Sequence, residues 1–265
     1  MTTSSPRTWA LILGVSSGFG GATAVELART GFDIFGVHLD RRVTMPLAEQ
    51  VMADVRAQER QAHFFNTNAA DAEDRAKVLD SMQQHMAGGG TVRVLMHSLA
   101  FGTLKPYVAA TAPDAMNQKQ MEMTQDVMAH SLVYWTQDLV ARGMMQRGGR
   151  IYAMTSAGDQ RVWASYGAVS AAKAALESHI RQLAFELAPK GITANAIRAG
   201  VTDTPALRKI PGNDQLIAGA TARNPSGRLT TPQDVARAIA ALADVRTAWI
   251  TGNVIGVDGG EDIVG

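Results

Sequence analysis

Short apolar runs alternate with longer amphipathic segments along most of this 265-residue chain. Each short run suffices for one buried strand, whereas the longer segments repeat their apolar residues with the period of a helix. Strands and helices that alternate in this way form a parallel sheet, because each helix returns the chain across one face of the sheet. Since such crossovers are right-handed, we expect an α/β fold with a doubly wound parallel sheet in three αβα layers.

The alternation also places the elements along the chain. The expected strands are 9–14, 33–38, 62–66, 93–97, 150–154, 193–197 and 254–257. The expected helices are 20–29, 46–58, 72–86, 119–145, 164–187 and 232–242. No segment between them has the composition of a linker, and the length suits one α/β domain. We therefore expect a single domain over residues 1–265.

The composition narrows the possible partners. Lysine and arginine (25) nearly balance aspartate and glutamate (24), so no basic surplus attracts nucleic acid or anionic lipid, and we expect neither partner. The chain contains no cysteine, which excludes disulfides and thiolate metal ligands. Residues 1–7 lack the apolar core of a signal peptide, and no apolar run is long enough to span a membrane. We expect a cytoplasmic protein that acts on a small molecule.

A glycine-rich turn joins the first expected strand to the first expected helix. It contains, in order, Gly14, Ser16, Ser17, Gly18, Phe19 and Gly20. Glycine tolerates positive φ and lets backbone N–H groups approach a pyrophosphate, whose negative charge the helix N-terminus favours. The turn therefore predicts a dinucleotide site, and together with the parallel sheet it makes the expected fold Rossmann-type.

The residues after the second strand bear on the choice of cofactor. An acidic residue at the end of this strand would hold the adenosine ribose of NAD, but the strand ends at His38. Arg41 and Arg42 follow, and their guanidinium groups suit the 2′-phosphate of NADPH. We therefore expect NADPH, bound by His38, Arg41 and Arg42. Asp40 keeps NADH open as the alternative.

Tyr166 and Lys173 lie in a segment whose apolar residues mark one buried helix face. Seven residues at about 3.6 per turn bring the two side chains within about 20° of one stripe, roughly 10 Å apart along the axis. A cofactor ribose spans that gap. In hydride chemistry Tyr166 would donate a hydrogen bond or a proton to the oxygen that becomes negative. Lys173 would bind the ribose hydroxyls and favour ionisation of Tyr166.

These motifs, in this order, resemble those of the short-chain dehydrogenase/reductase family, and the resemblance extends over residues 9–260. Most members place the lysine four residues after the tyrosine, where this chain has Ser170. The six residues between Tyr166 and Lys173 instead resemble the divergent branch of enoyl-acyl-carrier-protein reductases. Those enzymes reduce a carbon–carbon double bond conjugated to a thioester.

Three further features bear on the same branch. The run His97-Ser-Leu-Ala-Phe101 resembles the branch's cofactor segment after the fourth strand. Met128 stands where ordinary members have an asparagine that anchors a relay water, and methionine cannot replace it. Ser156 stands where many enoyl reductases carry a second tyrosine. The resemblance is therefore to the NADPH-preferring enoyl reductase type that keeps the ordinary glycine loop, as segment 224–229 also indicates.

The resemblance implies the remaining site residues. Ser156 would join Tyr166 and Lys173 in catalysis. Further cofactor contacts are implied at Asn68, Ala69, Ser98, Leu99, Ala100, Thr155, Lys173, Gly200, Val201, Thr202 and Thr204. Residues 205–225 would form a substrate lid, although a plain surface helix is an equal interpretation. The histidines show no metal-ligand spacing with carboxylates, so we expect no catalytic metal.

We therefore expect NAD(P)H-dependent reduction of a trans-2-enoyl thioester in fatty acid synthesis. The acyl group would be carried on acyl carrier protein or coenzyme A, and the resemblance of segment 249–260 to the family's last strand implies a homotetramer. A 3-oxoacyl-thioester or other carbonyl reductase, with Thr155 or Ser156 assisting Tyr166, is the first alternative. A dinucleotide-binding regulator without catalysis is the second, and the intact Tyr166 and Lys173 argue against it.

Overall fold

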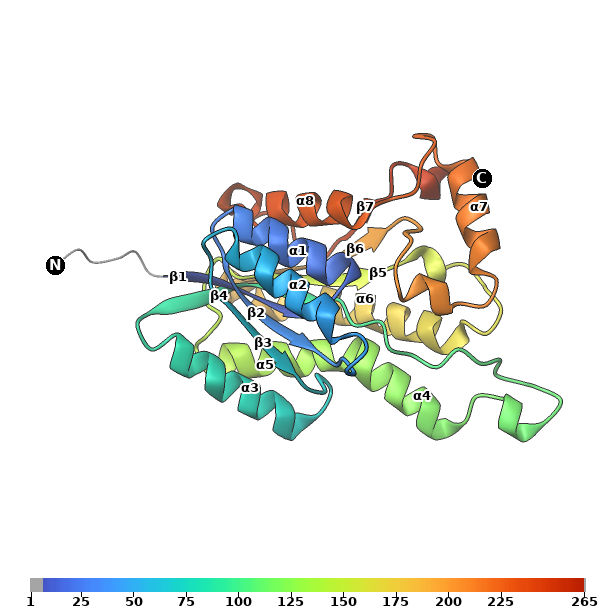
Figure 1. Cartoon of the computed structure of the whole chain (residues 1–265), viewed down its shortest axis with the longest axis horizontal. Coiled ribbons are helices and arrows are strands. Elements are labelled where there is room, and N and C mark those ends of the chain that lie inside the picture. Colours follow the sequence, from blue (N-terminus) through green and yellow to red (C-terminus); the bar gives the residue numbers. More distant parts are fainter. Residues whose placement is uncertain (1–6, 265) are drawn as a thin grey trace.

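A parallel sheet forms the centre of the protein, which a computed structural model describes over residues 7–264. Within these residues the sheet has seven strands in the order β3-β2-β1-β4-β5-β6-β7, which is the expected doubly wound arrangement (Figure 1). The strands are β1 (Arg7–Leu13), β2 (Asp33–His38), β3 (Ala62–Asn66), β4 (Gly90–His97), β5 (Arg150–Thr155), β6 (Thr193–Ala199) and β7 (Val254–Val257). Strand order reverses between β1 and β4, and sheets of this kind bind ligands at that switch point.

Helices cover both faces of the sheet and complete the three layers. One face is covered by α1 (Gly18–Arg29), α2 (Met45–Arg56) and α8 (Pro232–Leu242). The other is covered by α3 (Ala72–His85), α5 (Ser131–Ala141) and α6 (Gly167–Leu187), with α4 (Gln118–Gln125) beside α6. Helix α7 (Asn213–Arg223) stands apart from both layers, beyond the carboxyl ends of the strands (Figure 1). Residues 1–6, on which part of the expected lack of a signal peptide rests, lie outside the described residues.

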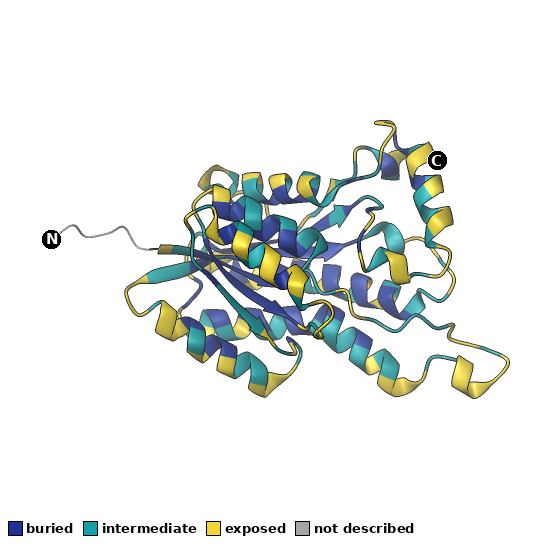
Figure 2. Ribbon diagram, in the orientation of Figure 1, coloured by how far each residue is buried: buried dark blue, intermediate teal, exposed yellow. Residues whose placement is uncertain are grey.

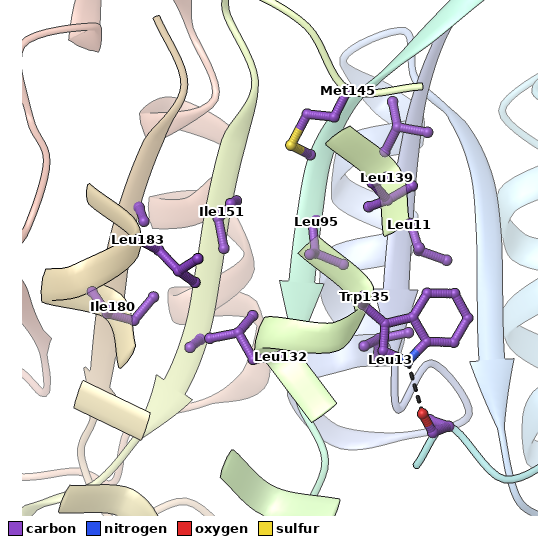
Figure 3. Packing of buried hydrophobic residues seen from close by; sticks show 14 of the residues in the cluster. Leu11, Leu13, Leu95, Leu132, Trp135, Leu139, Met145, Ile151, Ile180 and Leu183 are labelled. Carbon is purple, nitrogen blue, oxygen red and sulfur yellow. Dashed lines mark hydrogen bonds between the residues drawn. The ribbon is translucent and has the colours of Figure 1, made fainter. Parts of the chain in front are cut away.

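Alternating side chains of the central strands fill two cores. In β1, Leu11 and Leu13 point towards α5, whereas Ile12 points towards α1, and all three are fully buried. Trp135 of α5 lies in the first core, and its indole N–H donates a hydrogen bond of 2.8 Å to the Ala69 carbonyl (Figure 3). Figure 2 shows buried residues along the strands and on the inner faces of the helices. Each large apolar side chain buried in this way stabilises the fold by about 1.5–3 kcal/mol.

The helix expected over 119–145 is not continuous. It consists of α4, a π-helical turn (Asp126–His130) and α5, and it ends at Ala141. The apolar pattern continues because Met144 and Met145 are buried in the core, although they lie outside the helix. The Met144 carbonyl accepts a hydrogen bond of 2.8 Å from the Val92 N–H of β4, which ties this segment to the sheet.

The helix expected over 164–187 begins later, at Gly167, with Tyr166 as its N-cap residue. The preceding residue, Ser165, has a φ of +61°, so it lies in the left-handed region and cannot continue a right-handed helix. Tyr166 therefore stands at the junction of a strained turn and α6, and the spacing to Lys173 still covers two helical turns.

Candidate active site

The glycine turn between β1 and α1 needs glycine for two separate reasons. Gly14 has a φ of +90° and Gly18 a φ of +55°, which residues with a side chain rarely adopt. A Cβ on Gly14 would also collide with the Ser98 carbonyl oxygen, and a Cβ on Gly20 would collide with the Gly14 carbonyl oxygen. The turn, the start of α1 and the end of β4 are thus packed backbone against backbone.

The N-terminus of α1 suits the pyrophosphate of a dinucleotide. Within the described residues, the side chain of the N-cap residue Ser17 makes no capping hydrogen bond, and the first turn of the helix contains no acidic side chain. The first N–H groups of the helix are therefore able to bind an anion. Thr204 lies across the turn, with its methyl group 3.6 Å from where a Cβ of Gly18 would be. Thr204 is thus brought beside Gly18, and its contact with the cofactor stays a prediction.

The adenosine end of the site holds an acidic side chain. Nδ1 of His38 lies 2.9 Å from a carboxylate oxygen of Asp40. Burial alone would raise the pKa of Asp40, but hydrogen bonds with Thr44, Ser16 and His38 outweigh it, so this pKa is lowered. Because Ser16 belongs to the glycine turn, Asp40 lies between that turn and the end of β2, where the ribose of a dinucleotide binds.

The two arginines expected to bind the cofactor follow Asp40 directly in the chain. Arg41 and Arg42 are exposed, and within residues 7–264 neither guanidinium is hydrogen-bonded to a protein group. Their contact with a 2′-phosphate stays a prediction. Asp40, which had been set second to them, occupies the more enclosed position.

The segments after β3 and β4 border the same site. The exposed Asn68 begins a turn, in which its side-chain oxygen accepts a hydrogen bond of 3.1 Å from the Ala70 N–H. Ala69 is buried. After β4, the Ser98 N–H donates to the Leu13 carbonyl at 2.8 Å, so Ser98 and Leu99 lie beside Gly14 of the glycine turn, and Ala100 follows them in the chain. The contacts of these residues with the cofactor stay predictions.

Tyr166 and Ser156 meet at the reactive end. Burial raises the pKa of Tyr166, and a hydrogen bond with Ser156 opposes this rise only in part. The phenol therefore stays protonated at neutral pH and is able to donate. Gly158 packs edge-on against the ring, because a Cβ on Gly158 would lie 2.6 Å from a ring carbon of Tyr166. Any residue larger than glycine at position 158 would press against the ring, so Gly158 helps to set the position of the phenol.

Lys173 lies two turns further along α6 and is buried. Its Nζ donates a hydrogen bond of 2.7 Å to the Met154 carbonyl at the end of β5. Burial lowers the pKa of Lys173 to about 8, and the carboxylate of Glu177 opposes that fall. Nearby His97 is fully buried, and burial together with the charge of Lys173 lowers its pKa to about 3. His97 is therefore neutral, whereas Lys173 is protonated at neutral pH.

Thr155 does not face the reactive end in the way that the sequence suggested. Its hydroxyl is buried and donates a hydrogen bond of 2.8 Å to Oε1 of Glu177. A hydroxyl committed to a buried carboxylate is not free to bind a substrate oxygen. Of the two neighbouring residues considered for that task, only Ser156 is placed beside Tyr166.

The segment after β6 is held by the end of the chain. The Val201 N–H donates a hydrogen bond of 3.0 Å to Oε2 of Glu261, so this N–H is not free for a nicotinamide carboxamide. The Thr202 hydroxyl donates to the Gly200 carbonyl at 2.9 Å. Glu261 itself is buried. Glu261 thus satisfies the N–H of Val201 from the end of the chain.

Residues 205–225 contain a short 3₁₀ turn (Leu207–Lys209) and then α7. The Trp163 indole N–H donates a hydrogen bond of 3.0 Å to the Pro211 carbonyl, and its ring borders Gly212. The Tyr166 N–H in turn donates to the Trp163 carbonyl at 3.2 Å. The segment expected as a lid is therefore fastened to the turn that carries Tyr166.

Several of these residues were not among the predicted site residues. Glu177 is the one that the sequence could most easily have indicated, because it stands four residues after Lys173 on an otherwise apolar helix face. Gly158 and Trp163 carry no comparable signal, since their contacts depend on how the turn before α6 folds. Glu261 depends on a contact between segments about sixty residues apart.

Two absences concern only the part of the chain that the structure describes. Over residues 7–264, no three histidine, aspartate or glutamate side chains gather in a way that would hold a metal ion. No helix in that range is long and apolar enough to cross a membrane.

Comparison with known proteins identifies the family. Residues 14–261 match the family model described as "Enoyl-(Acyl carrier protein) reductase". The chain is 28% identical to 1-cyclohexenylcarbonyl-CoA reductase of Streptomyces collinus, over 99% of this chain and 89% of that protein. It is 29% identical to the 3-oxoacyl-[acyl-carrier-protein] reductase of Escherichia coli, over 95% of this chain and 96% of that protein.

The fold has a counterpart among solved structures. The crystal structure of enoyl-[acyl-carrier-protein] reductase (NADH) from Aquifex aeolicus superposes with a TM-score of 0.83, at 24% identity, over 98% of this chain and 97% of that one. It supports the fold alone, and the family rests on the match over residues 14–261. The chain thus belongs to the short-chain dehydrogenase/reductase family, in its enoyl reductase branch, and is an oxidoreductase that uses a nicotinamide dinucleotide.

Proposed function

We propose that this protein reduces the carbon–carbon double bond of trans-2-enoyl thioesters. The observation that carries the proposal is Met128, which is 2% exposed and lies in the π-helical turn, at the position of the family's relay asparagine. A carbonyl reductase must resupply a proton to its tyrosine, whereas an enolate is able to take its proton at carbon. The Thr155 hydroxyl donates its hydrogen bond to Glu177, so it is not available to bind a substrate carbonyl at the reactive end.

In the proposed reaction, a nicotinamide cofactor, when bound, would supply a hydride for the β-carbon of the substrate. Tyr166, a protonated phenol beside Ser156, donates a hydrogen bond to the thioester oxygen as negative charge develops there. Lys173 binds the ribose hydroxyls through the N–H groups that the Met154 carbonyl does not occupy. The α-carbon would then take a proton from water, which yields the saturated thioester and leaves the Tyr166 phenol protonated. Oxyanion donors of this kind contribute about 10²–10³ in rate.

For the cofactor, the geometry supports the alternative that the sequence left open. The ionised Asp40 carboxylate would accept hydrogen bonds from the ribose hydroxyls of NADH and would repel the 2′-phosphate of NADPH. We therefore favour NADH over the NADPH expected from Arg41 and Arg42. An Asp40→Ser variant should reduce the preference for NADH.

The remaining expectations belong to the same proposal. The acyl group would be carried on acyl carrier protein or coenzyme A, and residues 205–225 would cover it as a lid. We propose a homotetramer, supported by the edge position of β7 and by the exposed Trp249 nearby, which is 98% accessible in the single chain. One domain over 1–265, a role in fatty acid synthesis and a cytoplasmic location stay predictions from the sequence.

The test is the oxidation of NADH and NADPH in the presence of crotonyl and acetoacetyl thioesters. We expect turnover of the crotonyl thioester, and a loss of about 10²–10³ in kcat for Tyr166→Phe, because one oxyanion donor is removed. Cofactor affinity should be unchanged in this variant, which serves as the check on folding. Turnover of the acetoacetyl thioester alone would refute the proposal.

Carbonyl reduction is the second candidate, and one contact favours it. Ser156 lies close enough to Tyr166 to lower the pKa of its phenol, as a substrate-binding serine would. Ser156→Ala distinguishes the two reactions, because it should abolish carbonyl reduction and only weaken reduction of an enoyl thioester. Binding of cofactor without turnover of either thioester would instead indicate a regulator.

A further inference from the structure

A cluster of charged side chains lies behind Lys173 and connects four elements. Its centre is the Arg198 guanidinium of β6, which is 13% exposed. It lies 3.5 Å from Asp159 after β5, 3.5 Å from Glu177 of α6 and 3.4 Å from Asp262 near the end of the chain. Charges that are buried together need partners of opposite sign, since each loses its hydration. Asp262 also pairs with Arg161 at 2.8 Å, so three acids share two arginines and one negative charge is left for another cation.

Among the three acids, Glu177 is the one placed to direct its negative charge at Lys173. It stands one helical turn after Lys173 on the same buried face of α6, and both residues are 6% exposed. Oε1 of Glu177 accepts a hydrogen bond of 2.8 Å from the Thr155 hydroxyl. The Lys173 Nζ donates to the carbonyl of Met154, the residue before Thr155. Lysine and glutamate are thus anchored to adjacent residues at the end of β5.

We propose that Glu177 is a positioning residue: its carboxylate, clamped by Thr155 and Arg198, is the counter-ion that holds the Lys173 ammonium beneath the cofactor ribose. This inference rests on the role proposed for Lys173 in binding the cofactor. It adds a residue that touches neither substrate nor cofactor. Its effect is exerted through the charge of Lys173.

The other groups around Lys173 do not supply this charge. The titratable groups around this part of α6 are His97 of β4, Asp159 after β5, Tyr166 at the N-cap, Glu177 of α6 and Arg198 of β6. Burial raises the pKa of Glu177 and the charge of Asp159 adds to that rise, whereas the Thr155 hydroxyl and the Arg198 charge oppose it. His97 and Tyr166 are neutral, for the reasons given above. Asp159 shares the Arg198 guanidinium with Glu177, but its charge does not shift the pKa of Lys173. Glu177 is the group whose charge raises the pKa of Lys173 against the effect of burial.

The sharpest test removes the charge and keeps the shape. In Glu177→Gln the amide oxygen still accepts from Thr155, whereas the negative charge is lost. We expect the pKa of Lys173 to fall by about one pH unit or more, which is the usual effect of losing a close opposite charge. The measurement is a pH titration by NMR of the unliganded protein carrying ¹³Cε-lysine, with the Lys173 signal assigned through Lys173→Met. Glu186→Gln, an exposed change on the same helix, is the matched control and should leave the titration unchanged.

A second readout is cofactor affinity, followed by the fluorescence of the reduced nicotinamide. In Glu177→Gln it should weaken several-fold near pH 8 and less near pH 6.5, since Lys173 is deprotonated earlier. Glu177→Asp keeps the charge and should restore most of the wild-type titration, even if the Gln variant folds poorly. An unchanged Lys173 titration in Glu177→Gln would overturn the inference. No thioester is present in either measurement, so failure of the proposed enoyl reduction would not affect the result.

Discussion

The two ends of the candidate cofactor site differ in what builds them: backbone atoms form one end and buried side chains form the other. At the phosphate end, backbone packs against backbone, with Gly14 and Gly20 pressed against carbonyl oxygens. At the nicotinamide end, buried side chains carry the site, with Lys173 beside Glu177 and Tyr166 beside Ser156. Changes at the first end should therefore act through steric exclusion, and changes at the second through charge and protonation.

The largest effect is expected at the phosphate end, from Gly14→Ala. The added Cβ would collide with the Ser98 carbonyl, and alanine at a φ of +90° is strained as well. We expect a loss of stability of more than about 2 kcal/mol, because strain of about 1–2 kcal/mol adds to the steric collision, and a loss of cofactor binding. Urea unfolding and nicotinamide fluorescence measure the two effects.

Two other glycines separate these causes. Gly31→Ala has a φ of +101° but open space around its Cβ, so it should show the strain alone. Gly88→Ala has neither strain nor a close neighbour and should be almost neutral. If Gly14→Ala behaved like Gly31→Ala, close packing of backbone would not be what distinguishes the phosphate end.

The next effect concerns the position of the phenol. In Gly158→Ala the new Cβ would displace the Tyr166 ring, with little effect on the cores. We expect kcat to fall by about 10- to 100-fold, since displacement of a catalytic group by about 1 Å has effects of that size. The thermal midpoint and cofactor affinity should stay close to wild type. A normal kcat would show that the ring has room to move.

The smallest effect is a dependence on pH. The pKa of Lys173 is lowered to about 8, so its ammonium is present below that pH and is lost as the pH rises through it. The Kd of the cofactor should therefore rise several-fold between about pH 7 and pH 9. Lys173→Arg keeps its charge throughout this range and should flatten the profile. A flat profile in the wild-type protein would mean that Lys173 does not contribute its charge to binding.

The sheet could be predicted from the sequence because short apolar runs alternate regularly with amphipathic segments, and those segments form the helices of both layers. The expected strands 33–38, 62–66 and 254–257 match the observed ones, and the other four differ only at their ends. The break in helix 119–145 could not be predicted, because a π-helical turn leaves the apolar pattern intact. The late start of α6 depends on the left-handed Ser165, for which serine gives no local signal.

The candidate site divides in the same way. The glycine turn was predicted with its neighbours, since its conformation follows from local residue types. The enclosure of Asp40 could not be predicted, because it depends on Ser16 of the glycine turn, which lies far from Asp40 in the sequence. Glu177 lies one helical turn after Lys173, so the sequence pattern alone could have indicated it. Glu261 and Trp163 act through tertiary contacts that no local pattern records.

The central claim is that hydride reaches the β-carbon of an enoyl thioester at Tyr166. Mass spectrometry of the product tests this directly, with crotonyl thioester and cofactor deuterated at the transferable position of the nicotinamide. The account predicts a butyryl product with one deuterium at the β-carbon, formed by the wild-type protein and much more slowly by Tyr166→Phe. Absence of label from this product, with label in the 3-hydroxybutyryl product of an acetoacetyl substrate, would contradict it.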